Sequence, residues 1–133
     1  MTQDLKRPAR IKDPALMRLL KFEYDCCEIS GLTGDLHLHH VILKGQGGDD
    51  LRENIICMSK KLHELYHQGQ PAARLLIAQH VDTQRPDVAC YIAEKLGSAD
   101  ALLEWFARHT EAITQCVCDR INTRHCPVHG NLA

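Results

Sequence analysis

The chain has 133 residues, 44% of them hydrophobic, and a formal net charge of −1. This length is typical of one domain, and the near-neutral charge argues against a surface that binds polyanions throughout. No apolar run approaches the roughly 18 residues of a membrane span, and residues 1–4 do not begin a signal peptide. We therefore expect a cytoplasmic protein.

Residues 1–25 are expected to form a basic segment followed by a helix. Asp13 and Pro14 are typical of a helix start, because aspartate caps the first turn and proline fits its first position. Apolar residues continue this helix to about Tyr24. The cations of the segment could follow a phosphate backbone, and a solvated helix face is an equal alternative. They are Lys6, Arg7, Arg10, Lys12, Arg18 and Lys21.

Residues 26–69 are predicted to form a strand, a loop, a second strand and a helix. In the first part of residues 35–43, leucines alternate with histidines, which is the pattern of a strand. A glycine-rich turn separates this strand from a second short apolar stretch, residues 55–58. Helix-forming residues then begin at Lys60 and end at Gly69.

Residues 70–115 are predicted to be a helical extension. Helical spacing recurs over 72–80 and 88–96, and Ser98 can cap a further helix. Residues 116–133 are expected to form an irregular tail rich in cysteine and histidine. The predicted fold class is α+β, with a hairpin-plus-helix core, an N-terminal helix and additional C-terminal helices.

Histidine and cysteine are clustered along the chain, which points first to metal binding. Five of the nine histidines lie between residues 37 and 67, and the odd number of cysteines, seven, argues against a disulfide framework. His63 and His67 are four residues apart on the predicted helix, so they share one face and can chelate one ion. Two solvated surface histidines are the simpler alternative for this pair alone.

His39 and His40 stand near the end of the first predicted strand and could add a third ligand. Three protein ligands, with positions left open for water and substrate, are what a catalytic metal needs. Neighbouring residues of a regular strand point to opposite faces. Both histidines can therefore act at one centre only if the strand bends, or if His40 reaches the substrate from beside the metal.

Four segments together resemble the HNH endonuclease family, the ββα-metal or His-Me finger nucleases of phage and bacterial type. The match covers about residues 26–68, and the His, Asn, His order of the family falls on His40, Asn54 and His63. The segments are Leu38-His39-His40-Val41-Ile42, Gly47-Gly48-Asp49-Asp50, Glu53-Asn54-Ile55-Ile56 and His63-x-x-x-His67.

The resemblance implies a ββα-metal core and a role for each matched residue. His39, His63 and His67 would hold one divalent ion, which could be Mg, Mn, Ni or Zn. His40 would be the general base that activates a water molecule. Asn54 would hold the hairpin together and orient His40 through backbone hydrogen bonds.

The resemblance also implies the reaction, which is hydrolysis of phosphodiester bonds in double-stranded DNA. Either nicking or double-strand cleavage, with low sequence specificity, is compatible with a chain that has no obvious recognition module. Family members of this size are often phage-encoded or bacterial. They act in the cytoplasm of the bacterial host cell, beside DNA-packaging or restriction machinery and not at a membrane.

Two other functions stay open. The hairpin and helix could form a non-catalytic, metal-stabilised module for nucleic-acid binding or assembly, and the intact His40 argues against this alternative. The chain could instead be a metal-binding interaction protein whose 72–109 helices dock a partner. Trp105 and Phe106 could anchor that partner, although the leucines beside them favour packing in the core.

Three further residues near the hairpin are candidates for nucleic-acid binding. Lys44 and Arg52 flank the hairpin and could bind phosphates. His37 shares a strand face with His39, so it could contact DNA or support the metal ligands from behind. An ordinary exposed histidine is the alternative for His37.

The sequence departs from the family in its cysteines. Many members carry two Cys-x-x-Cys pairs that hold a structural zinc, and here the pair beginning at Cys27 lacks its second cysteine. The positions of the other pair are occupied by Ser59 and Leu62. We therefore expect no zinc at this place, and we expect Cys26, Cys27 and Cys57 to be buried thiols.

The C-terminal tail offers a second possible metal site. Its cysteines and histidine could form a closed four-ligand zinc knuckle, with a flexible tail as the alternative. The candidate ligands of this structural zinc are Cys116, Cys118, Cys126 and His129.

Overall fold

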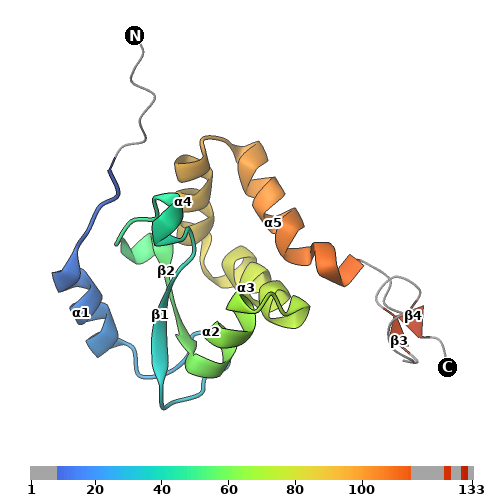
Figure 1. The fold of residues 1–133 in the computed structure, drawn as a ribbon, viewed down its shortest axis with the longest axis horizontal. Helices are drawn as coiled ribbons and strands as arrows, with labels where there is room; N and C mark the ends of the chain where they lie inside the picture. Colours follow the sequence, from blue (N-terminus) through green and yellow to red (C-terminus); the bar gives the residue numbers. More distant parts are fainter. Residues whose placement is uncertain (1–8, 115–124, 127–129, 132–133) are drawn as a thin grey trace, which may run out of the picture.

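The computed structural model describes residues 9–114, 125–126 and 130–131, and within them helices and a β-hairpin are combined in one mixed fold (Figure 1). The predicted α+β class is confirmed at this level. None of the described helices is long and apolar enough to cross a membrane. The elements are α1 (Pro14–Glu23), β1 (Leu36–His40), β2 (Ile55–Ser59), α2 (Lys60–His67), α3 (Pro71–Gln84), α4 (Pro86–Leu96), α5 (Ala99–Thr114), β3 (His125–Cys126) and β4 (Gly130–Asn131).

Helix boundaries follow the signals in the sequence. Asp13 caps α1 by accepting a hydrogen bond from the backbone N–H of Leu16 at 3.0 Å. Ser59 caps α2 in the same way, with the N–H of Leu62 at 3.2 Å. Helix α4 ends at Gly97, whose φ of 97° lies in the left-handed region that favours glycine. The predicted starts of α1 and α2 and the predicted end of α4 are confirmed.

Strands β1 and β2 pair antiparallel, with His39 opposite Ile56 and His40 opposite Ile55. All five residues of β2 are buried. We expected the first strand to reach residue 43, but β1 ends at His40. Beyond His40 the backbone N–H of Ile42 is bound by the Asn54 side chain, at 2.8 Å, and not by the backbone of a neighbouring strand. The strand pairing therefore ends at His40.

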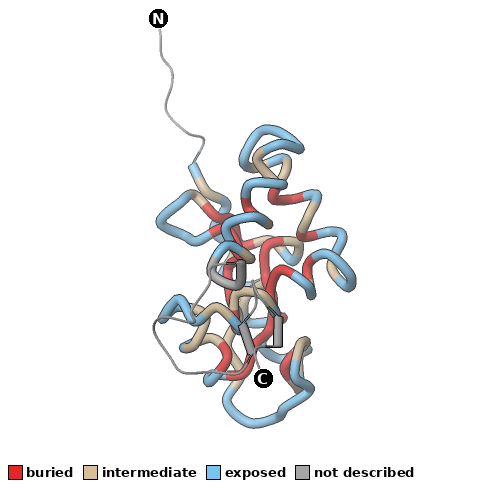
Figure 2. Tube along the Cα trace, turned by 90° about the vertical axis from the view of Figure 1, so that its right-hand side faces the viewer, coloured by how far each residue is buried: buried red, intermediate tan, exposed pale blue. Residues whose placement is uncertain are grey.

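The hairpin lies between α1 on one side and α2–α5 on the other (Figure 1). Buried segments run through the centre of the molecule where these elements meet (Figure 2). Trp105 is 5% exposed and belongs to this core, whereas Leu103 on the same helix is 65% exposed. Because Trp105 is buried in the core, it is not available as an exposed anchor for a partner.

A half-buried ion-pair network joins the hairpin to the helical extension through Glu28. Its carboxylate accepts the N–H of Cys57 at 2.8 Å, Nε2–H of His80 at 3.0 Å and Nη1–H of Arg85 at 2.8 Å. Arg85 also donates to the backbone oxygen of Ile55 at 3.0 Å. Glu28 follows Cys27 directly in the sequence. Cys27 and Cys57 are buried, and Cys26 is half-buried.

Glu28 remains ionised well into the acid range. Burial alone would raise the pKa of Glu28, but the hydrogen bonds from His80, from the Cys57 N–H and from Arg85 lower it to about 2. Because this value lies below the ordinary 4.5, the carboxylate stabilises the folded state above about pH 4.5. That contribution is lost as the pH falls toward 2.

We predict that Glu28→Gln lowers the free energy of unfolding by about 2 kcal/mol at pH 7, because the half-buried Arg85 then keeps only its more exposed partner Asp87. Urea unfolding between pH 7 and pH 2.5 measures this, and the variant should lose less stability than the wild type below pH 4.5. Glu23→Gln is the matched control, because Glu23 pairs with Arg52 on the exposed surface. The control should change stability by less than about 1 kcal/mol. Equal effects of the two substitutions would contradict the stabilising role of the Glu28 network.

Candidate metal centre

The structure brings together the three histidines that the sequence predicted as metal ligands. His39 lies on β1, and His63 and His67 lie on successive turns of α2. Each offers a ring nitrogen, and these three atoms lie within 4.8 Å of one another. The Nε2 atoms of His63 and His67 are 3.0 Å apart, so these two imidazoles point at the same space.

His39 is the most constrained member of the cluster. It is 1% exposed, and neither of its ring nitrogens has a hydrogen-bond partner among the described residues. Burial, together with the neighbouring His63 and His67, lowers the pKa of His39 to about 3. The ring is therefore neutral at pH 7 and presents an unused lone pair to the cluster. Buried polar atoms normally have a partner, and a metal ion would supply one.

The donor set fits a divalent transition metal. Burial, with smaller contributions from His67 and His37, lowers the pKa of His63 to about 4, so this ring is also neutral at pH 7. Neutral imidazoles suit zinc and nickel, whereas magnesium prefers oxygen ligands. Within the predicted range of metals, the residues present therefore favour Zn and Ni over Mg.

His37 lies behind the metal centre and contacts one of the candidate ligands. Its Nδ1 is 2.9 Å from Nδ1 of His63, and the two rings meet edge to face. With Nε2 of His63 directed at the cluster, Nδ1–H of His63 donates to His37. The sequence left open that His37 supports a metal ligand from behind. In the structure the ligand it contacts is His63, whose ring this hydrogen bond orients.

Tyr66 forms one wall of the candidate metal centre and connects it to α5. Its ring packs against His39, with 4.7 Å between ring centroids. Its hydroxyl donates to Nε2 of His109 at 2.7 Å, because Nδ1–H of His109 donates to the Trp105 carbonyl at 2.8 Å. Burial lowers the pKa of His109 to about 4, which leaves Nε2 free to accept. Sequence reasoning missed Tyr66 and His109, and the position of Tyr66 one turn after His63 was the available signal.

His40 points to the other face of β1, as strand alternation requires. It is 7% exposed, and its Nε2–H donates to Oδ1 of Asp50 at 2.8 Å. Asp50 is further held by Arg10 and by the N–H of Asp13 at 2.8 Å. Burial lowers the pKa of His40 more than Asp50 raises it, so the imidazole is neutral at pH 7. His40 is thus buried in a polar setting and not in an apolar one.

Asn54 joins the segment that follows β1 to the loop that carries Asp49 and Asp50. The side chain is fully buried, and its Oδ1 accepts the N–H of Ile42. Its Nδ2 donates to the carbonyl of Ile42 at 3.1 Å and to that of Asp49 at 3.0 Å. The loop passes so close that a Cβ on Gly48 would lie 1.6 Å from the Ile42 oxygen, so only glycine fits there. Asn54 thereby fixes the loop that carries Asp50.

Asp49 anchors the same loop to the segment before α1 and to α4. One of its oxygens accepts the N–H of Ile11 at 2.6 Å, and the other accepts the hydroxyl of Tyr91 at 2.7 Å and Nζ of Lys95 at 3.0 Å. The sequence indicated only a turn at this position, so the roles of both aspartates were missed. Two adjacent acids closing a glycine-rich loop were the available signal.

The remaining candidate residues lie apart from the histidine cluster. Arg10 donates to Asp50 and to the carbonyl of Gly48, so this cation of the basic segment is engaged within the protein. Arg52 pairs with Glu23 at 3.0 Å, and Lys44 is exposed. The four possible zinc ligands of the C-terminal tail lie outside the residues whose side chains the structure describes; they are Cys116, Cys118, Cys126 and His129.

Comparison of the chain with protein-family models, with curated proteins and with solved structures finds no match in any of the three.

We predict that His37→Ala weakens metal binding about 10- to 100-fold, because the His63 ring loses the partner that fixes its orientation. Competition with a chromophoric chelator, using zinc and nickel, measures the dissociation constant. His37→Gln keeps an oxygen acceptor near Nδ1 of His63 and should recover most of the affinity. If His37→Ala binds both metals as tightly as the wild type, the orienting role of His37 is wrong.

Proposed function

We propose that the protein is a metal-dependent endonuclease of the HNH type that hydrolyses phosphodiester bonds of DNA. The observation that carries the proposal is the cluster of His39, His63 and His67, in which the buried His39 nitrogens have no hydrogen-bond partner among the residues that the structure describes. The order of β1, β2 and α2 supports a ββα-metal core, because the hairpin and the helix that follows it both contribute to one cluster. The metal would be divalent and held by these three imidazoles.

When bound, a divalent ion at these three residues would stabilise negative charge on the scissile phosphate and on the leaving 3′ oxygen. The protein's own part in the reaction falls to His40, which lies on the face of β1 opposite His39 and would therefore reach the scissile phosphate from beside the metal. Asp50 accepts Nε2–H of His40, which leaves Nδ1 unprotonated and able to take a proton. The ionised Asp50 also stabilises the imidazolium that forms. Burial alone would raise the pKa of this carboxyl, but its hydrogen bonds and Arg10 keep the pKa low.

The proposed step is a direct hydrolysis. A water molecule gives a proton to Nδ1 of His40, and its oxygen forms a new bond to phosphorus. The bond from phosphorus to the 3′ oxygen breaks, and this oxygen takes a proton from solvent water, so the products carry a 5′-phosphate and a 3′-hydroxyl. Asn54 contributes indirectly, because it holds the loop in which Asp50 lies next to Asp49.

One observation favours a second candidate, a non-catalytic DNA-binding or assembly module stabilised by metal. His40 is buried and paired with a carboxylate, which also suits a purely structural histidine. The two candidates differ in what His40 must do. Only the nuclease needs His40 to exchange a proton with water.

We predict metal-dependent nicking of supercoiled plasmid, lowered about 10²- to 10⁴-fold by His40→Ala, because general-base catalysis contributes in this range. Gel assays with magnesium, manganese, nickel and zinc measure the activity, and chelator competition shows that His40→Ala still binds metal. His67→Ala should lose both metal and nicking. Lys61→Ala is the control, since Lys61 is exposed on α2 and has no part in the proposed chemistry.

Two outcomes separate the candidates. Plasmid that is retarded on a gel but not nicked with any of the four ions would favour the binding module. Nicking by His40→Ala at the wild-type rate would show that another group activates the water.

A further inference from the structure

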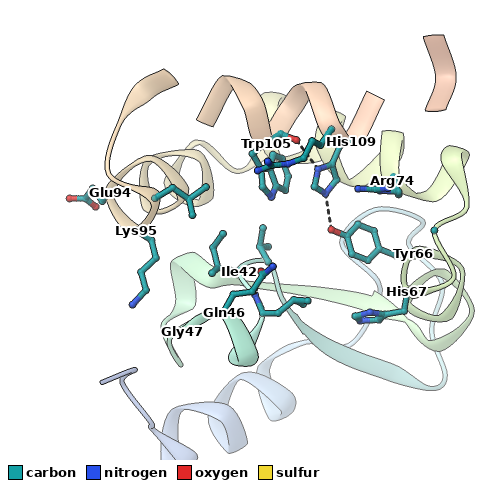
Figure 3. A pocket seen from close by; sticks show the side chains of 15 residues that line it. Ile42, Gln46, Gly47, Tyr66, His67, Arg74, Glu94, Lys95, Trp105 and His109 are labelled. Atoms are coloured by element: carbon teal, nitrogen blue, oxygen red, sulfur yellow. Dashed lines mark hydrogen bonds between the residues drawn. The ribbon is translucent and has the colours of Figure 1, made fainter. Parts of the chain in front are cut away.

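A cavity of about 1050 Å³ opens beside the metal centre (Figure 3). Its floor is the segment that follows β1, residues 41–47, and its other walls come from α2, α3, the end of α4 and α5. His67 and Tyr66 lie at one end of it, and Lys95 lies at the other (Figure 3). A candidate metal ligand is therefore also a wall of the cavity, so the two sites are continuous.

Two arginines line the cavity with no ion-pair partner in the described part of the chain, and the one carboxylate of the lining, Glu94, lies at the Lys95 end (Figure 3). Arg74 on α3 and Arg108 on α5 have no carboxylate within ion-pair distance among the described residues. Both lower the pKa of His109, which marks them as neighbours of the Tyr66–His109 pair. Lys95 differs, because it is already bound to Asp49. Guanidinium groups of this kind, beside a proposed phosphodiester centre, favour an anionic ligand with phosphates.

The size of the cavity limits what it can accept. A volume of about 1050 Å³ is at the upper end of pockets that enclose one drug-sized ligand. A cavity of this volume is too narrow to enclose a B-form duplex, because the major groove of the duplex alone is about 12 Å wide. One strand of a few nucleotides fits such a space, and positively charged grooves with aromatic walls are typical of single-strand sites. Here the aromatic wall is supplied by Tyr66 and His67.

We propose that this cavity receives an unpaired DNA strand leading away from the metal centre, with Arg74 and Arg108 binding its phosphates. The proposal rests on the nuclease function and narrows the substrate class to DNA with a junction between duplex and single strand. The helical extension α3–α5 then has a defined task, since it contributes both cations. An exposed His67 imidazole is the point at which the strand passes from the scissile phosphate into the cavity.

Fluorescence anisotropy tests the proposal with two labelled probes, a blunt duplex and the same duplex with a ten-nucleotide overhang. The measurements use zinc-loaded protein carrying His40→Ala, in which cleavage is expected to be too slow to consume the probe. We expect the overhang to bind at least about fivefold more tightly. Adding Arg74→Gln and Arg108→Gln should abolish this preference. It should also reduce the slope of log affinity against log salt by about 1.4, because each phosphate that an arginine neutralises on a single strand contributes about 0.7.

The matched control removes two charges elsewhere. Lys60→Gln with Lys61→Gln changes two exposed lysines of α2 and should keep the preference for the overhang. Arg74→Lys with Arg108→Lys should restore the salt slope. Thermal unfolding checks that each variant is folded.

Three results would decide the matter. Equal binding of blunt and overhanging DNA by the parent protein overturns the proposal, even if plasmid nicking is observed. A preference that survives replacement of both arginines overturns it as well. A preference that depends on both arginines, in a protein that nicks no DNA with any metal, supports the cavity and refutes the nuclease function.

Discussion

Burial of the His39 imidazole between β1 and α2 is the constraint on which the candidate site depends. A buried polar group without a hydrogen bond costs about 1–3 kcal/mol, so the fold bears this cost at a position that faces two further imidazoles. A divalent ion between the rings would supply the missing partner. Such an ion would also give the hairpin and the helix a common function.

Strand alternation divides the proposed chemistry between the two faces of β1. His39 faces α2 and the other imidazoles, while His40 faces the loop that carries Asp50. Different residues hold each face in place. Tyr66 and His109 pack behind His39, and Asn54 fixes the loop that faces His40. The Glu28 network then holds the hairpin against α3 and the start of α4.

Much of this arrangement could be predicted from the sequence, because the signals are local. The pair of histidines four residues apart, the caps at Asp13 and Ser59 and the alternation before His39 all act within a few residues. The end of β1 could not be predicted, since it depends on Asn54, twelve positions beyond Ile42.

The supporting residues were missed for the same reason. Asp50 is ten positions from His40, His109 is 43 from Tyr66, and Arg85 is 57 from Glu28. No periodicity or spacing rule connects residues so far apart. Their partners are defined only once the helices pack against the hairpin. The cavity with Arg74 and Arg108 has the same origin, because it forms between segments that the sequence separates.

X-ray absorption spectroscopy of the full chain, loaded with one equivalent of zinc or nickel, tests the central claim most directly. The account predicts a shell of three imidazole nitrogens at about 2.0–2.1 Å, with the remaining ligands being oxygen, and one imidazole fewer in His39→Ala. A sulfur shell near about 2.3 Å would place the ion on cysteines instead. An unchanged imidazole count in His39→Ala would show that His39 is not a ligand, and either result would contradict the account.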